Sequence, residues 1–185
     1  MDLTSAPVPD LRPDDHVRGD GPLVVVYADF ACPHCAVAHA RITEVGGLTV
    51  VFRHFALKAK HPRAPALAAA AEAAALQRQF WPFHDALYAD QGRQADPHLW
   101  ALAERLGLDV ERFDADRRSE AVIDRVKRDV RDAIKAGVTA TPTLYLQGEA
   151  HAGPPTTARL HSVRNDEKQE EAVDPKDSRG KDNSI

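Results

Sequence analysis

Phe30-Ala31-Cys32-Pro33-His34-Cys35 decides the fold, because it holds both cysteines of the 185-residue chain where a strand pattern gives way to a helix pattern. Residues 23–27 before it form a β-branched run of the kind that strands favour. After it, apolar residues recur at helical spacing, and Pro33 suits the first position of a helix. Cys32 is therefore expected at a helix N-terminus, where unpaired backbone N–H groups and the helix dipole stabilise an anion.

This position is expected to give the two thiols different chemistry. The first thiol of such a Cys-x-x-Cys can ionise with a pKa of roughly 3.5–7.5, against about 8.5 for free cysteine. Cys35, one turn into the helix, should be more buried and able to close a disulfide onto Cys32. We expect His34 to place a partly positive imidazole near the Cys32 thiolate, which would lower its pKa further and make the disulfide more oxidising. The stretch is therefore predicted to be a redox site.

Two other interpretations of the cysteine pair remain open from the residues alone. Cys32, Cys35 and His39 supply three candidate ligands of a zinc site, although structural zinc needs four and no second ligand pair follows in the sequence. The pair could also be two buried thiols without any chemistry. A strand before the motif and a helix after it favour the redox interpretation.

Composition and charge narrow the class of protein. The net charge of -4 and the lack of a dense basic cluster argue against nucleic-acid binding. The first residues have neither the basic nor the apolar region of a signal peptide, and no stretch is apolar enough to span a bilayer. Two cysteines at redox spacing, with none spare, suit an intracellular redox motif. We therefore expect a cytoplasmic protein without membrane association.

Hydrophobic patterning divides the chain into five parts. They are an irregular arm with room for a short edge strand (1–20), a βαβ unit with parallel strands (21–62), an inserted all-helical block (63–136), a second strand-containing part that ends in a weak helix at 156–163 (137–163), and a charged tail (164–185). Within the helical block, Asp109 and Ser119 are expected to cap helices. The tail is predicted to be disordered, because it has too few apolar residues to offset its ordering entropy.

A second informative stretch, Gly137-Val138-Thr139-Ala140-Thr141-Pro142-Thr143, precedes a strand pattern. An X–Pro bond is cis in only about 5–6% of cases in folded proteins, and proline is tolerated at the first residue of a strand. The residues alone therefore predict that the bond before Pro142 is trans, at the start of a strand.

Taken together, these features resemble the DsbA-like thiol:disulfide oxidoreductases over most of the chain. The resemblance is carried by Cys32-Pro33-His34-Cys35 after Tyr27-Ala28-Asp29-Phe30, by the helical insertion, and by Thr139-Ala140-Thr141-Pro142-Thr143 before a strand. It implies an α/β protein with a thioredoxin fold and an inserted all-helical subdomain. It also implies that Pro142 is cis and that its loop lies against the cysteines, so that the Thr141 backbone pairs with an extended substrate segment.

The resemblance further implies a thiol:disulfide oxidoreductase that exchanges disulfides with protein thiols, of oxidising character because Cys-Pro-His-Cys is typical of oxidising members. No cofactor or metal is expected. The expected partners are protein thiol or disulfide substrates and a redox partner, and we expect a monomer. A thioredoxin-like reductant, an isomerase, and a non-catalytic metal-binding or peptide-binding module are the alternatives. The expected site consists of catalytic Cys32, Pro33, His34 and Cys35, with Thr141 and Pro142 binding substrate.

The chain departs from the pattern of this family at one position that matters for catalysis. Val26 stands six residues before Cys32, where many members carry a buried acid. Proton transfer at Cys35 must then use another group or water, and Asp29 and His39 are the candidates. His61, past the second strand, is expected to be an ordinary surface or packing histidine.

Overall fold

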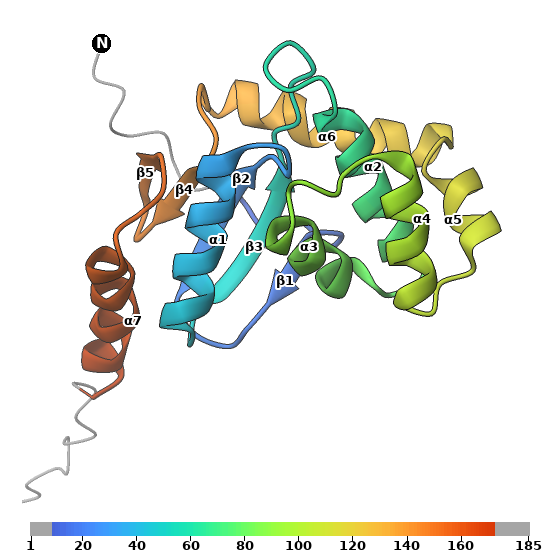
Figure 1. Ribbon diagram of the computed structural model, residues 1–185. Coiled ribbons are helices and arrows are strands. Elements are labelled where there is room, and N and C mark those ends of the chain that lie inside the picture. The colour runs from blue at the N-terminus through green and yellow to red at the C-terminus, as the bar shows by residue number, and fades with distance from the viewer. Residues whose placement is uncertain (1–8, 173–185) are drawn as a thin grey trace, which may run out of the picture.

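The computed structural model describes residues 9–172, with side chains as far as residue 165. The strands are β1 (His16–Arg18), β2 (Leu23–Ala28), β3 (Thr49–His54), β4 (Thr143–Leu146) and β5 (Glu149–Ala152). They form a five-stranded mixed sheet in the order β1-β3-β2-β4-β5 (Figure 1). The helices are α1 (Pro33–Val45), α2 (Ala64–Ala75), α3 (Phe80–Ala89), α4 (Asp96–Arg105), α5 (Val110–Asp116), α6 (Glu120–Lys135) and α7 (Thr157–Ala172).

β2 is the central strand and pairs in parallel with β3 and antiparallel with β4. Its side chains alternate between two cores. Val24 and Val26 pack in the larger core with residues of α1, α3 and α7, whereas Val25 and Tyr27 pack in a second core that includes Ala133 of α6. Because helices cover both faces of the sheet, the strand is apolar along its whole length.

The inserted helices α2–α6 form a block beside the β3 side of the sheet (Figure 1). Residues 67–74 of α2 are buried all round, as an alanine-rich helix must be if it is to contribute to a core. The small side chains allow both α3 and α6 to pack against α2. Asp109 and Ser119 accept hydrogen bonds from the backbone N–H groups of Arg112 and Val122, so both predicted caps are confirmed. The predicted α/β arrangement with an all-helical insertion is thus observed.

The C-terminal helix is longer than the sequence pattern predicts. Leu160 and Val163 of α7 are buried in the larger core, and the Arg164 guanidinium donates to the Val45 carbonyl at the end of α1, 2.9 Å away. Anchored by these contacts, the helix continues to Ala172. The prediction of a disordered tail is therefore wrong for residues 164–172, and residues 173–185 lie outside the described part of the chain. Within residues 9–172, no helix combines the length and apolarity needed to cross a membrane.

The N-terminal arm is tied to the sheet by buried charges. β1 pairs antiparallel with β3, and the preceding Asp15 receives hydrogen bonds from the buried Arg53 guanidinium at 2.7 and 2.9 Å. Arg12 contacts both Asp15 and the fully buried Asp129 of α6, at 3.1 and 2.7 Å. Burial raises the pKa of Asp15, but the hydrogen bonds from Arg53 and the Arg12 backbone, together with the charges of both arginines, outweigh burial and hold the pKa at about 2. The arm, β3 and α6 are thus joined by one ionic network.

Replacing Arg53 by methionine is expected to cost about 3–5 kcal/mol of unfolding free energy, because it leaves Asp15 with reduced charge compensation in the interior. The folded-state pKa of Asp15 is depressed, so its contribution is present above the unfolded pKa of 3.8 and is lost as pH falls toward about 2. The deficit of R53M should therefore shrink over that pH interval in urea unfolding followed by circular dichroism. The partly exposed Arg128, paired with Asp14, provides the control R128M, with an expected loss below about 1 kcal/mol. Equal losses in the two variants would contradict this account.

Candidate active site

The two cysteines lie at the junction between β2 and α1. Cys32 is the N-cap residue of α1, with an extended backbone conformation, and Pro33 occupies the first turn. The Cys32 N–H donates to the Asp29 carbonyl at 3.1 Å, which closes a tight turn between the strand and the helix. Both cysteines are free thiols and both are buried. The sequence pattern predicts this placement correctly, since a strand signal, a proline and a helix period all meet here.

Cys32 is arranged to be a thiolate. A hydrogen bond from the Cys35 thiol lowers the pKa of Cys32 most, burial opposes it, and Thr141 and the backbone N–H groups of Cys35 and His34 lower it further, to about 4. The backbone donors belong to the first turn of α1, where N–H groups have no carbonyl partner within the helix, whereas Thr141 comes from the loop before β4. At neutral pH the Cys32 sulfur is therefore negatively charged and nucleophilic.

Cys35 is arranged in the opposite way. Burial raises the pKa of Cys35, and its hydrogen bond to Cys32 raises it further. Only 1% of the residue is exposed, and the Asp29 backbone N–H donates to its sulfur at 3.4 Å. Cys35 is thus a protonated thiol that must lose its proton before it can act as a nucleophile toward a disulfide.

The loop before β4 lies directly opposite Cys32. The Thr141–Pro142 peptide bond is cis, as the family resemblance implies, and the trans bond expected from the residues alone is wrong. The Cys32 sulfur lies 3.5 Å from the Thr141 carbonyl oxygen, to which it can donate when it is protonated, across 109 positions of sequence. The register of the strands brings the two segments together. β4 pairs antiparallel with β2, and Thr143 lies opposite Tyr27, which precedes the cysteine turn. Cysteine pair and proline loop therefore form one site.

His34 and Pro33 lie on the exposed side of the motif. The His34 contribution to the Cys32 thiolate comes through its backbone N–H, and among residues 9–165 its imidazole makes no hydrogen bond or ion pair. The expected electrostatic role of the His34 ring stays a prediction.

Asp29 and His61 form a pair next to the cysteine turn. Asp29 is 2% exposed, accepts from the Ala31 N–H at 2.8 Å, and meets His61 Nδ1 at 2.5 Å. Burial raises the pKa of Asp29, while the contacts with Ala31 and His61 oppose the shift. His61 is therefore not an ordinary surface histidine, because it compensates a buried carboxylate beside the active site. Its separation from Asp29 in sequence left no local signal for this role.

Two glutamines that the sequence pattern does not identify hold the same turn from the helical block. The Gln91 side-chain amide donates to the carbonyls of Phe30 and Cys32 at 2.7 and 3.1 Å. Gln94 donates to the Phe30 carbonyl at 2.9 Å. Both lie in the connection between α3 and α4, where polar residues normally indicate only a solvated loop. The insertion thus satisfies carbonyl groups that the sharp turn leaves without partners.

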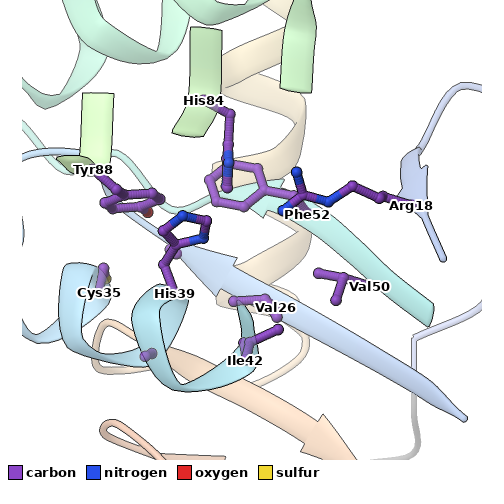
Figure 2. Close-up of a pocket in the computed structure, with 11 residues that line it drawn as sticks. Arg18, Val26, Cys35, His39, Ile42, Val50, Phe52, His84 and Tyr88 are labelled. Atoms are coloured by element: carbon purple, nitrogen blue, oxygen red, sulfur yellow. The ribbon is translucent and has the colours of Figure 1, made fainter. Parts of the chain in front are cut away.

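His39 lies on α1, one turn beyond Cys35, and points toward α3 (Figure 2). Its ring stacks on Tyr88 and meets His84 edge-on, with centroid distances of 5.0 and 4.9 Å. The potential metal-ligand atoms of Cys32, Cys35 and His39 do not all lie within 4.8 Å of one another. Among the described residues, two groups of three side chains do meet this distance: His16-His54-Glu72 and His39-His84-Asp85. The geometry therefore gives no support to a zinc site built on the cysteine pair.

Comparison with known sequences gives a family for this arrangement. The model of the DSBA-like thioredoxin domain matches residues 23–164. The Na(+)/H(+) antiporter NhaA 1 of Mycolicibacterium vanbaalenii is 44% identical over 161 residues, which cover 81% of this chain and 26% of the antiporter. The NhaA antiporter of Herminiimonas arsenicoxydans is 41% identical over 161 residues, covering 82% of the chain and 25% of that protein. The chain thus spans about a quarter of the length of these curated relatives.

Solved structures agree on the fold. A thioredoxin-like oxidoreductase from Silicibacter pomeroyi superposes with a TM-score of 0.74 at 23% identity, over 85% of this chain and 94% of that one. The α-DsbA1 protein of Wolbachia pipientis gives a TM-score of 0.72 at 22% identity, over 88% and 95% of the two chains. The predicted thioredoxin fold with a helical insertion is confirmed. With a family match that includes both cysteines and the proline loop, the chain belongs to the DSBA-like thioredoxin domain family.

Proposed function

We propose that this protein exchanges disulfides with protein thiols through Cys32 and Cys35, and that it acts as an oxidant. The observation that carries the proposal is the opposite setting of the two thiols, with the pKa of Cys32 lowered to about 4 and that of Cys35 raised. A stabilised thiolate favours the reduced form of the pair, which makes the disulfide more strongly oxidising. The proposed direction is therefore donation of the Cys32–Cys35 disulfide to a substrate.

In this direction a substrate thiolate attacks the Cys32 sulfur of the disulfide. The bond between Cys32 and Cys35 breaks, and Cys35 leaves with the electron pair and gains a proton. A second substrate thiolate then attacks the substrate sulfur that is bound to Cys32. The substrate forms its disulfide and Cys32 leaves as the stabilised thiolate. A redox partner must reoxidise the pair.

The loop opposite Cys32 supports the proposed site for the substrate. The Thr141 carbonyl is 3.5 Å from the Cys32 sulfur, so an extended segment bonded to Cys32 would lie alongside the Thr141–Pro142 backbone. Backbone pairing of this kind tolerates many side chains, which suits a protein that acts on different thiols. Antiport is an activity of the longer relatives and is not part of the proposal, because this chain spans about a quarter of their length. The cytoplasmic location and the monomeric state expected from the sequence stay predictions.

The reduction potential of the Cys32–Cys35 pair tests the proposal directly. Equilibration with glutathione buffers and counting of free thiols should give a value near the ~-120 mV of DsbA. A value near the ~-270 mV of thioredoxin would contradict the oxidising assignment and favour a reductant instead. Failure of the pair to exchange at all would overturn the enzymatic assignment.

Replacement of each cysteine by serine is expected to block a different step of the exchange reaction. C32S should abolish turnover, because it removes the sulfur that both half-reactions use. In the presence of a disulfide substrate, C35S should accumulate a mixed disulfide through Cys32, because the resolving thiol is missing. Trapping of substrate, read by non-reducing electrophoresis, separates the two variants. Equal and partial losses of activity in both would show that the roles are wrongly assigned.

Titration of the Cys32 thiol should show how far the hydrogen bond from Cys35 lowers the pKa of Cys32. In the reduced protein, the ultraviolet absorbance of the thiolate should fall only as pH approaches about 4. C35A removes the hydrogen bond that lowers the Cys32 pKa most, so the midpoint should move to higher pH. H161A, on the exposed side of α7, is the control and should leave the midpoint in place. An unchanged midpoint in C35A would show that the helix terminus alone stabilises the thiolate.

A further inference from the structure

The Cys35 thiol needs a proton carrier, since the proposed exchange cycle moves one proton on or off its sulfur. Only 1% of Cys35 is exposed, and burial raises the pKa of its thiol. A buried thiol of this kind cannot exchange its proton directly with bulk solvent at a useful rate. Val26, on the strand beneath it, is apolar and supplies no titratable group. The carrier must therefore come from another element of the fold.

A small cavity beside Cys35 is the first part of a route. Its volume is about 20 Å³, and Val26, Cys35, His39, His84 and Tyr88 are among its lining residues (Figure 2). A cavity of this size can hold one water molecule if polar groups face it. Because the Val26 wall is apolar, the polar groups of the cavity come from α1, from α3 and from Arg18 of β1.

The polar groups around this cavity suit a bound water. The Tyr88 hydroxyl is buried and has no hydrogen-bond partner among the described residues. His84 uses Nδ1 to contact Asp85 at 2.8 Å, so its other ring nitrogen is the one not engaged by that contact. With the Cys35 sulfur and the His39 imidazole, these groups supply the two to four partners that a buried water requires.

His39 also lines a second, open cavity on the outer side of α1. This cavity has a volume of about 530 Å³, and Arg18, Gly46, Gly47 and Asp85 are among its other lining residues. His39 thus lines both the cavity beside Cys35 and this larger one, as do Arg18, Ile42 and Val50. Its side chain is the titratable group of α1 that lines both.

The surroundings of His39 lower its pKa, so the ring is free of its second proton at neutral pH and has a nitrogen that can accept one. Burial lowers the pKa of His39, and the Asp85 carboxylate at 3.6 Å partly opposes this. The titratable and charged groups that face the ring are Cys35 from α1, His84, Asp85 and Tyr88 from α3, and Arg18 from β1. Arg18 and His84 both contact Asp85, which limits how strongly its charge acts on His39.

We propose that His39 is the proton carrier for Cys35, acting through a water molecule in the small cavity, as a part of the proposed exchange reaction. When Cys35 resolves a mixed disulfide, its thiol gives a proton to the water, and the water gives one to the His39 imidazole. The Cys35 thiolate then attacks the Cys32 sulfur, the bond from Cys32 to the substrate breaks, and the substrate leaves as a thiolate. The imidazolium releases its proton into the open cavity. In the oxidising direction the steps run in reverse: His39 takes a proton from solvent, and its imidazolium gives a proton through the water to the leaving Cys35 sulfur.

Asp29 with His61 is the competing carrier in this structure. Its carboxylate oxygens are already engaged by the Ala31 N–H and by His61, whereas the His39 ring lines the cavity that holds the Cys35 side chain. Asp29 and His61 do not line this cavity, so the two routes can be separated by substitution.

The test follows the decay of the mixed disulfide when the reduced protein is mixed with oxidised glutathione. Acid quenching and mass spectrometry give the rate as a function of pH. H39Q should slow resolution by about ten- to a hundredfold at neutral pH, at the lower end of what general acid–base groups contribute. The deficit should shrink at alkaline pH, where solvent species take the proton instead. The thiolate titration of Cys32 should stay unchanged, which a merely structural defect would not allow, and H161A should behave as the parent protein.

Several outcomes overturn the proposal. Resolution as fast in H39Q as in the parent protein, at every pH, would exclude His39. A slow H61A variant beside a normal H39Q variant would assign the proton to Asp29 and His61. As a second check, V26D in the H39Q background places a carboxyl group at the cavity wall and should restore part of the rate. A folded double variant as slow as H39Q would contradict a route through this cavity. If the parent protein forms no mixed disulfide, it is the proposed function that fails.

Discussion

The pairing of β2 with β4 is the constraint on which the site depends. β2 ends in the cysteine turn, and β4 begins after the proline loop, so their antiparallel register decides which residues meet. With Tyr27 opposite Thr143, the Thr141 carbonyl arrives at hydrogen-bond distance from the Cys32 sulfur. A slip of one residue would turn every side chain of β4 to the other face of the sheet. Burial of both faces of β2 makes such a slip costly, because each face packs in its own core.

The chemistry of Cys32 and Cys35 arises because the fold places two identical side chains in different surroundings. Cys32 occupies the N-terminus of α1 and receives hydrogen bonds that favour its anion. Cys35, three residues later, faces the core and loses its access to water. The same helical turn therefore provides a nucleophile on one side and a protonated thiol on the other. A sharp strand-to-helix turn is enough to create this asymmetry, provided that its backbone carbonyl groups find partners.

The helical insertion supplies those partners and is thus part of the site. Gln91 and Gln94 satisfy the carbonyls of the turn, and α3 brings His84 and Tyr88 to the cavity beside Cys35. His61, which precedes the insertion, pairs with the buried Asp29. The insertion therefore completes the polar surroundings of a motif that the βαβ unit alone would leave with unpaired groups.

The sequence by itself determined the features that depend on neighbouring residues. The βαβ unit, Cys32 at a helix start, the caps at Asp109 and Ser119, and the all-helical block could all be predicted, because periodicity, capping and turn chemistry are local. The cis form of the Thr141–Pro142 bond needed a family resemblance, since the residues alone favour trans.

Only the tertiary structure decided which distant side chains meet. The length of α7 depends on where Leu160 and Val163 dock, and the pairing of Asp29 with His61 depends on the path of the chain after β3. The cavity beside Val26, Cys35 and His39 exists because β1, β2, β3, α1 and α3 all contribute side chains to its wall. Such contacts are set by strand register and by close packing between elements, and neither leaves a signal in a short window of sequence.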